Sequence, residues 1–548
     1  MSPEEQGGAI PHSQTQPLGD SANTERRIAG NSKGKFWSVG VALLCLGLFT
    51  IKAVTSLVQE SATWDETHYF AVGKFILQNH RWDVPGAAQH PPLSYYINSI
   101  PLLLFPGDPS VWKGHGMHDA LVRGQALLSS PANQGDLLLD LSRLMMVLTG
   151  VLLGWFVYVW SFSLYGEASS ILAIVLYSFC PNILAHARLI TPDITVATFS
   201  FLTFYYLWRF LRNESTVDAV IGGLCLGLAL LSKFTGLLLV PICLGLMFLW
   251  RAKERKLNLR NCLVFAAIAA VVLCMGYGMQ PRLCYAGILQ QHDSAREEIR
   301  HFLMGRYSNG WWYYYIVAFV IKTPVTALLF LAMAVVLFAS NIPKGRWLDE
   351  VFLLLPALAV FCFFSVNNVQ IGLRYILPVY PFLFVFASRA ARIFVFHKIR
   401  MGLYIAAIGW YIAASCFIHP HYLAYFNELV GGPDNGWKYL VDSNLDWGQD
   451  LKGLKRFMDE HGISRISLSY FGTDSPARYG IVYDWLPSFV LTNPTPGHHA
   501  PMLQRWVAIS ATCLQGTYFP NQDLFADFRK RTPAAKIGYS IFIYKLDD

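Results

Sequence analysis

Residues 64–67 read Trp-Asp-Glu-Thr, and residues 89–96 read Gln-His-Pro-Pro-Leu-Ser-Tyr-Tyr. Both stretches lie within residues 59–105, directly after the first long apolar segment of the chain. Two adjacent carboxylates at a membrane exit are solvated at little cost, so an ordinary interfacial loop would explain Asp65 and Glu66. Other isolated charges of the apolar segments, however, are expected on the same side of the membrane. That coincidence favours a shared site.

The composition indicates a membrane protein. The chain has 548 residues, of which 54% are hydrophobic and 14% charged, and this is too apolar for a soluble globular protein. Apolar stretches close to 20 residues recur, and they are typical of transmembrane helices. Residues 1–35 are instead rich in small and polar residues, so we expect a disordered cytoplasmic tail there. The late start of the first apolar run argues against a cleaved signal peptide.

About eleven transmembrane helices are expected between residues 36 and 418. They cover residues 36–58, 137–160, 170–186, 193–211, 217–232, 236–250, 261–279, 323–340, 350–366, 375–389 and 401–418. Lys and Arg collect in loops on one side, for example in residues 251–260 and 389–400, which places that side and the amino terminus in the cytoplasm. The net charge of +8 mostly reflects this bias and does not indicate a nucleic-acid partner. The same bias predicts a large first outer loop, residues 59–136.

From residue 419 onward the composition becomes that of a soluble domain. Residues 465–471, 505–511 and 537–545 alternate as strands, and an amphipathic helix precedes them. With an odd number of spans, we expect residues 419–548 to form an extracytoplasmic α/β domain. Three aspartates stand just before this helix: Asp442, Asp446 and Asp450. They offer oxygen ligands to a divalent cation, while capping and surface solvation are the alternative. The sequence contains neither a CxxC pair nor an HExxH motif, so a structural zinc site is not expected.

Charges of both signs are expected on the outer face. The acids are Asp65, Glu66 and Asp193, and the cations or potential cations are His90, Lys233, Lys322 and Arg374. Charges in a membrane are costly unless they are paired or hydrated, so this set indicates a polar cavity at the outer leaflet. Group transfer from a lipid phosphate uses both signs, because cations hold the phosphate as it leaves and a carboxylate takes a proton from the acceptor. Structural pairing, helix capping by Asp193 and the gate of a transporter are the alternatives.

Six short motifs follow one another over residues 36–420. They are Trp-Asp-Glu after the first span, His-Pro-Pro-Leu-x-Tyr-Tyr, Thr-Pro-Asp, Ser-Lys-Phe-Thr-Gly, Lys-Thr-Pro and Leu-Arg-Tyr-Ile-Leu-Pro. Their order resembles that in the polyprenyl-phosphate-dependent glycosyltransferases of GT-C fold, the group of protein O-mannosyltransferases and lipid A aminoarabinose transferases. The resemblance therefore implies a polytopic α-helical membrane protein of GT-C-like fold.

The resemblance also implies roles for individual residues. Asp65 matches the catalytic base, with Glu66 as its neighbour, and Asp193 matches a second acidic position. Lys233 and Arg374 match cations that contact the lipid phosphate, and we place His90, Lys322 and Tyr375 with them as substrate-binding residues. The aminoarabinose transferases carry Glu-Lys before the two prolines. This chain has Gln89-His90 there, which lacks a permanent charge and a carboxylate metal ligand.

These features predict a mannosyltransferase-like glycosyltransferase of the cell (inner or plasma) membrane. It would move a sugar from a polyprenyl-phosphate donor to an extracytoplasmic protein hydroxyl or glycolipid by one inverting displacement. Because the lipid phosphate leaves as an anion, no nucleotide cofactor is expected. A transporter or flippase of polyprenyl-linked sugars is the alternative, although no internal repeat of the two-half transporter type is visible. A membrane scaffold for the outer domain would leave the embedded charges unexplained.

Overall fold

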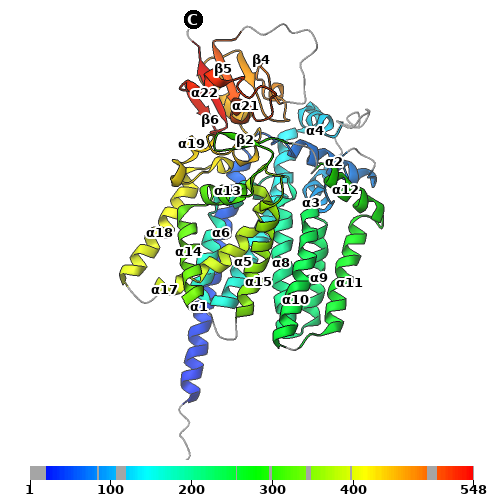
Figure 1. Ribbon diagram of the computed structural model, residues 1–548, viewed down its shortest axis with the longest axis vertical. Helices are drawn as coiled ribbons and strands as arrows, with labels where there is room; N and C mark the ends of the chain where they lie inside the picture. The colour runs from blue at the N-terminus through cyan, green and yellow to red at the C-terminus, as the bar shows by residue number, and fades with distance from the viewer. Residues whose placement is uncertain are drawn as a thin grey trace, which may run out of the picture.

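The chain forms a helical bundle with a small sheet domain at one end (Figure 1). The computed structural model describes residues 20–82, 86–105, 119–254, 256–294, 299–340, 347–394, 398–489 and 503–546. The first helix, α1 (Asp20–Leu57), starts at the end of the bundle opposite the sheet. Part of the tail that was expected to be disordered is therefore helical, and residues 1–19 lie outside the described residues.

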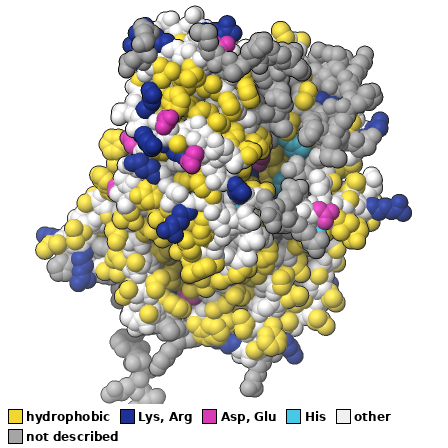
Figure 2. All heavy atoms as spheres, turned by 45° about the horizontal axis from the view of Figure 1, so that its top comes forward, with side chains coloured by type: hydrophobic (Ala, Val, Ile, Leu, Met, Phe, Trp, Pro, Cys, Tyr) yellow, Lys and Arg dark blue, Asp and Glu magenta, His cyan; other side chains and the backbone are white. Residues whose placement is uncertain are grey.

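Most of the bundle consists of apolar helices of very different lengths. After α1 they are α5 (Gly135–Tyr165), α6 (Glu167–Ser178), α7 (Pro181–Ala187), α8 (Pro192–Asn213), α9 (Thr216–Leu230), α10 (Leu239–Glu254), α11 (Leu259–Gly276), α13 (Tyr314–Lys322), α14 (Val325–Ser340), α15 (Trp347–Ser365), α16 (Val379–Ser388), α17 (Ala391–Phe394) and α18 (Lys398–Phe417). Hydrophobic side chains cover much of the bundle face in Figure 2, as lipid contact requires. Within the bundle, α5 and α6 approach so closely that a Cβ on Gly154 would lie 2.6 Å from the Tyr177 ring.

About eleven spans are expected, and the described helices can be compared with them. In the described part of the chain, seven helices are long and apolar enough to cross a membrane, or up to nine if each of two bent pairs is one span. The bent pairs are α6 with α7, at 58°, and α13 with α14, at 112°. The other two expected spans, α9 and α16, are helices of 15 and 10 residues. At about 1.5 Å per residue, neither reaches across a hydrocarbon core of about 30 Å.

The first outer loop folds into a helical layer at the sheet end of the bundle. Its helices are α2 (Glu66–Asn79), α3 (Leu93–Ser99) and α4 (Asp119–Ser129), and residues 83–85 and 106–118 lie outside the described part. Tyr69, Phe70 and Tyr95 are among the buried residues that hold this layer together. Two further elements lie between α11 and α13: α12 (Pro281–Ser294) and a hairpin of β1 (His301–Leu303) and β2 (Arg306–Ser308).

The C-terminal domain contains a five-stranded sheet of order β4-β3-β5-β7-β6. The strands are β3 (Ile466–Ser469), β4 (Tyr483–Trp485), β5 (Trp506–Ser510), β6 (Ala535–Ile537) and β7 (Ile541–Lys545), and the short helices are α20 (Leu451–Glu460), α21 (Ala511–Gln515) and α22 (Ala526–Lys530). β3 pairs in parallel with β4 and β5, whereas β7 pairs antiparallel with β5 and β6. β3, β5 and β7 correspond to the three predicted strands. The predicted apolar face of α20 is buried against the sheet.

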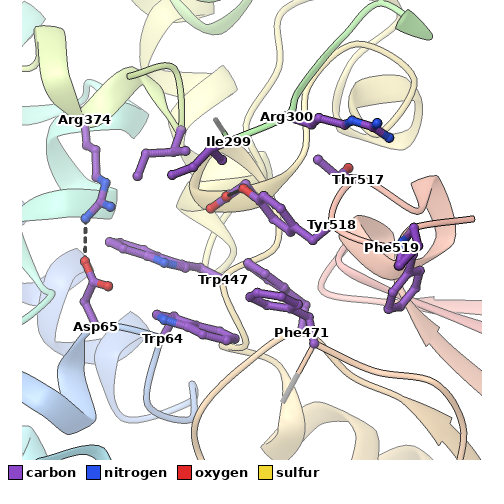
Figure 3. A pocket seen from close by; sticks show the side chains of 14 residues that line it. Trp64, Asp65, Ile299, Arg300, Arg374, Trp447, Phe471, Thr517, Tyr518 and Phe519 are labelled. Carbon is purple, nitrogen blue, oxygen red and sulfur yellow. Dashed lines mark hydrogen bonds and ion pairs between the residues drawn. The ribbon is translucent and has the colours of Figure 1, made fainter. Parts of the chain in front are cut away.

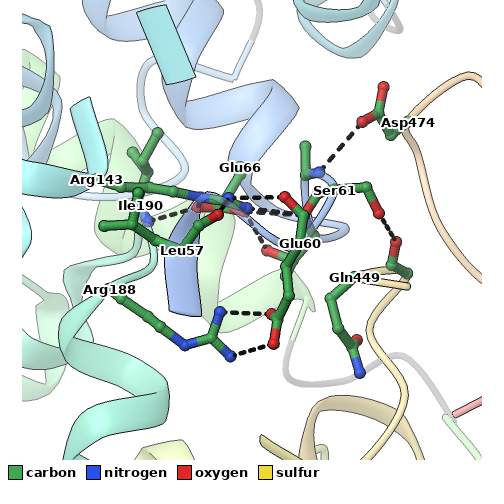
Figure 4. A network of polar contacts seen from close by, with 12 residues as sticks. Leu57, Glu60, Ser61, Glu66, Arg143, Arg188, Ile190, Gln449 and Asp474 are labelled. Atoms are coloured by element: carbon green, nitrogen blue, oxygen red, sulfur yellow. Dashed lines mark hydrogen bonds and ion pairs between the residues drawn. The ribbon is translucent and has the colours of Figure 1, made fainter. Parts of the chain in front are cut away.

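The C-terminal domain is joined to the bundle through the segment between α1 and α2. The backbone N–H of Ser61 donates to the carbonyl of Gln449 at 2.8 Å, and that of Trp64 donates to the carbonyl of Trp447 at 2.8 Å. Asp474 accepts a further hydrogen bond from the backbone N–H of Ala62 at 3.1 Å (Figure 4). The Trp-Asp-Glu stretch is therefore held between the bundle and the sheet domain, and this contact positions the site.

Candidate active site

Four charged side chains from distant parts of the chain form one cluster at the sheet end of the bundle. Nη1 of Arg374 lies 2.6 Å from Oδ2 of Asp65 and 3.9 Å from Oδ2 of Asp193. Oδ1 of Asp193 in turn accepts a hydrogen bond from Nζ of Lys233 at 2.7 Å. We call these residues the charge cluster. Two carboxylates and two cations alternate in it, so each charge has a neighbour of opposite sign.

Local structure explains how each member reaches the cluster. Asp65 directly precedes α2, and Lys233 directly precedes a short 3-10 helix, Phe234–Leu238. Asp193 lies in the first turn of α8, where Thr191 and not Asp193 is the N-cap residue. The capping alternative for Asp193 is therefore wrong, because its carboxylate contacts Lys233 instead.

Arg374 belongs to a 3-10 turn, Leu373–Ile376, that follows a glycine. Gly372 has φ 150°, and a Cβ there would lie 2.2 Å from Oγ of Ser443, so a side chain would not fit. The backbone N–H of Leu373 donates to Oδ1 of Asn444 at 2.9 Å. The C-terminal domain therefore sets the position of Arg374.

Aromatic rings lie beside both cations of the cluster. Nζ of Lys233 is 4.2 Å from the centre of the Tyr375 ring, and Cζ of Arg374 is 4.4 Å from the centre of the Trp447 ring. These distances are typical of cation–π contacts. Tyr375, which is expected to bind substrate, lies beside Lys233. Trp447 is not among the expected site residues, although its Asp-Trp-Gly-Gln context was a visible signal.

The cluster lies at the boundary of two pockets. A cavity of about 720 Å³ opens toward the C-terminal domain and is lined by Asp65, Arg374, Asp442 and several aromatic rings (Figure 3). A much smaller pocket of about 20 Å³ is lined by Lys233, Arg374, Tyr375 and apolar residues of α8, α10 and α15. Arg374 lines both. The site thus has a polar and aromatic outer part and an apolar part among the helices.

Glu66 does not lie in the site, contrary to the prediction. Its side chain is fully buried, and Oε2 lies 2.6 Å from Nη2 of Arg143 (Figure 4). It also accepts hydrogen bonds from the backbone N–H groups of Thr63 at 2.8 Å and Ile190 at 3.0 Å. All of these contacts hold the outer segment in place. Adjacent residues at a helix start point in different directions, and this is why Asp65 and Glu66 separate.

Lys322 is buried next to the site but contacts backbone. Its Nζ donates to the carbonyls of Leu423 and Tyr425, each at 3.0 Å, and to the carbonyl of Asn444. Because Asn444 anchors Leu373, Lys322 supports Arg374 indirectly. We therefore replace the expected substrate-binding role of Lys322 with a positioning role.

His90 is buried beside the cluster, and its ring stacks on Tyr69 with centroids 5.5 Å apart. Burial, together with the positive charge of Lys233, holds the pKa of His90 well below its usual range. Among the described residues, Nδ1 of His90 has no hydrogen-bond partner. This favours the neutral imidazole, so His90, expected as a potential cation that binds substrate, lies beside the cluster as a polar group.

The three aspartates of the C-terminal domain do not converge. Asp442 accepts a hydrogen bond from the Tyr518 hydroxyl, Asp446 accepts one from the backbone N–H of Thr512 at 2.8 Å, and Asp450 accepts one from Ser540 at 2.6 Å. Within the described ranges, no group of three or more His, Cys, Asp or Glu residues could hold a metal ion. The divalent cation therefore stays a prediction. The sequence singled out Asp442 only as a possible cation ligand. In the structure it lines the outer cavity.

Residues 139–277 match the family described as Dolichyl-phosphate-mannose-protein mannosyltransferase. This segment runs from within α5 to the residue after α11 and contains Asp193 and Lys233. The resemblance deduced from the short motifs is therefore confirmed over this part of the chain. No curated protein matches the chain at a significant level.

Two solved structures resemble the chain distantly. ArnT from Cupriavidus metallidurans, bound to undecaprenyl phosphate, is 14% identical, with 92% of this chain and 97% of that chain covered and a TM-score of 0.48. The oligosaccharyltransferase of Archaeoglobus fulgidus in its apo form is also 14% identical, with 70% and 54% covered and a TM-score of 0.43.

Proposed function

We propose that the chain is a membrane glycosyltransferase that moves a sugar from a polyprenyl-phosphate donor to an acceptor on the sheet side of the membrane. The observation that carries this proposal is the position of the charge cluster. Asp65 and Arg374 line the outer cavity, whereas Lys233 and Arg374 line the apolar pocket among the helices. The donor has a lipid tail, a phosphate and a sugar. These parts would occupy the apolar pocket, the cations of the charge cluster and the outer cavity, in that order.

Arg374 and Lys233 are the residues proposed to bind the donor phosphate. Nε of Arg374 is buried and, among the described residues, has no hydrogen-bond partner. Guanidinium groups bind phosphate with two parallel hydrogen bonds, and a lysine adds a point charge. The polyprenyl chain would extend along the apolar residues of α8, α10 and α15 that line the smaller pocket, such as Val196, Leu239 and Val360. Because the phosphate gains charge as it leaves, both cations would bind the transition state more tightly than the donor.

Asp65 is the proposed general base. Its side chain is 23% exposed, and it lines the outer cavity from which an acceptor would arrive. The acceptor oxygen would attack the anomeric carbon and give its proton to Asp65, while the bond between that carbon and the phosphate oxygen breaks and its electron pair stays on the phosphate. Attack from the face opposite the phosphate inverts the configuration at the anomeric carbon.

The sheet end of the bundle is proposed to face the extracytoplasmic side. The turn between α10 and α11, near Arg251 and Lys253, and the short helix α17, with Arg392, lie at the opposite end (Figure 1). Basic loops are retained in the cytoplasm. The charge cluster and the C-terminal domain would then meet donors and acceptors outside the cytoplasm.

The test is a transfer assay with the purified protein in nanodiscs, supplied with radiolabelled polyprenyl-phosphate sugars and a panel of acceptors. We expect label in the acceptor and free polyprenyl phosphate as the second product. Lys233→Ala should weaken polyprenyl-phosphate binding. Arg209→Ala is the control and should not weaken it, because Nε of Arg209 lies 3.1 Å from Oδ1 of Asp218, away from the site. Equal donor affinity in both variants, or an intact lipid-linked sugar that merely changes leaflet, would overturn the proposal.

A further inference from the structure

The outer cavity has a continuous aromatic lining. The Trp64 ring lies 5.0 Å from Phe471 and 5.5 Å from Phe489, with interplanar angles of 22° and 23°. Tyr518 lies 5.7 Å from Phe471, at 16°, and 5.1 Å from Phe489, at 32°. These four residues line the same cavity as Asp65 (Figure 3), and we call them the aromatic wall. The bundle side contributes one ring, and the C-terminal domain contributes three.

The wall is not fully covered by the residues around it. Phe489 is 43% exposed, although aromatic side chains of that size are usually buried when they only serve packing. Trp64 and Tyr518 are partly exposed as well. Part of the apolar surface of these rings is therefore accessible in the cavity.

Polar groups accompany the wall. The Tyr518 hydroxyl donates to the carboxylate of Asp442, which also lines the cavity. Asp442 has φ 57°, a conformation that is uncommon outside glycine and that is enriched at functional sites. Oγ1 of Thr517 is buried and lacks a hydrogen-bond partner among the described residues, although Thr517 lines the cavity. A ligand on the wall would find one hydroxyl and one carboxylate beside it.

This combination fits a neutral sugar ring. One face of a pyranose is made of C–H groups and stacks on an aromatic ring, while its hydroxyl groups require hydrogen-bond partners at the edge. A phosphate-rich acceptor would need several cations beside the wall. Arg374 contacts Asp65 and is assigned to the donor phosphate, so Arg300 is the one remaining cation among the described residues of the lining. Strand addition is one common way to bind an extended peptide, and neither edge strand of the sheet, β4 or β6, lines the cavity.

We propose that the aromatic wall is the acceptor subsite and that the acceptor is a neutral carbohydrate, a pyranoside or the end of a glycan chain. This inference rests on the proposed function. A ring stacked on Trp64 would lie next to Asp65, which follows it in the chain. One hydroxyl of that ring would lose its proton to Asp65 as its oxygen bonds to the anomeric carbon of the donor, and the donor phosphate would leave with the bonding electron pair.

The test measures binding and transfer separately. Methyl hexopyranosides and maltotriose are added to the protein in nanodiscs, and contact is followed by saturation-transfer NMR. We expect signals from the C–H face of the sugar, and we expect Phe489→Ala to weaken binding and to raise the acceptor KM by up to about tenfold. Tyr518→Phe keeps the ring and should weaken binding less. Phe489 is exposed enough for its replacement to leave the fold intact, and unchanged polyprenyl-phosphate affinity would verify this.

Trp312→Ala is the matched control, because Trp312 is 69% exposed and does not line the cavity. Its sugar binding should equal that of the unaltered protein. Absence of pyranoside binding, or equal binding in the Phe489→Ala and control proteins, would overturn the inference. Transfer to a peptide or a lipid without pyranoside binding would overturn the inference alone and leave the glycosyltransferase in place. Pyranoside binding without any affinity for polyprenyl phosphate would refute the donor and hence the proposed function.

Discussion

Arg374 donates a hydrogen bond to Asp65 at 2.6 Å across a sequence separation of 309 residues. The pair joins the turn before α16 to the start of α2. It also connects the proposed phosphate-binding group to the proposed base. Because one guanidinium contacts the carboxylate and lines the donor pocket, donor binding and base orientation would depend on each other.

Asp65→Asn should reduce turnover by about 10²- to 10⁴-fold while donor affinity remains, because the amide keeps the shape but cannot accept the proton. Single-turnover transfer and polyprenyl-phosphate binding, measured on the same preparation, separate the two effects. Near-normal transfer by a folded Asp65→Asn protein would remove Asp65 from the mechanism.

Donor affinity should fall in Lys233→Ala and also in Arg374→Lys. Lysine keeps the charge but cannot make two parallel hydrogen bonds to a phosphate. If the phosphate charge grows in the transition state, kcat should fall together with affinity. Titration of polyprenyl phosphate into nanodiscs provides the affinities, and unchanged values in both variants would contradict the phosphate-binding role.

Glu66→Gln should destabilise the protein without altering the chemistry of the folded fraction. The change removes the close carboxylate partner of the buried Arg143 and leaves Asp140, whose Oδ1 lies 3.9 Å from Nη1 of Arg143. Breaking a buried pair costs about 3–5 kcal/mol. Asp459→Asn is the control, because Asp459 pairs with Lys455 and its side chain is 63% exposed. Thermal unfolding should show a large decrease for the first variant and almost none for the second. Comparable decreases in both would argue against the structural role of Glu66.

The stability of the C-terminal domain should depend on pH through Asp446. Burial raises the pKa of Asp446 to about 7 in the folded protein, whereas an unfolded aspartate titrates near about 4. Between these values the folded state binds more protons, so the free energy of unfolding falls as the pH rises from about 4 to about 7. Asp446→Asn should lose this dependence. Unfolding of both proteins at several pH values checks the prediction, and a constant difference between them would contradict it.

A reporter fused after Leu257 should read cytoplasmic, and one fused after Asp548 should read extracytoplasmic. The reason is the basic loop between α10 and α11, which should be retained inside. If both fusions report the same side, the sheet domain and the basic loops share a compartment. The proposed orientation of the site would then be wrong.

The sequence was sufficient where structure depends on local pattern. Apolar stretches predicted the helices, and alternation predicted β3, β5 and β7, because both patterns follow from neighbouring residues. Local hydropathy did not show where α9 and α16 begin and end, since helix ends depend on caps and packing. The short motifs likewise identify Asp65, Asp193, Lys233 and Arg374 as candidate site residues.

Only the tertiary structure decided which of these charges meet. Asp65 and Glu66 are adjacent in the chain, yet one contacts Arg374 and the other is buried on Arg143, because the first precedes a helix and the second starts it. The aromatic wall could not be predicted from the sequence either, because the packing of the C-terminal domain on the bundle brings Trp64 and Phe471 together. Local sequence determines which elements form. Contacts between residues hundreds of positions apart depend on how those elements pack, and no short pattern encodes them.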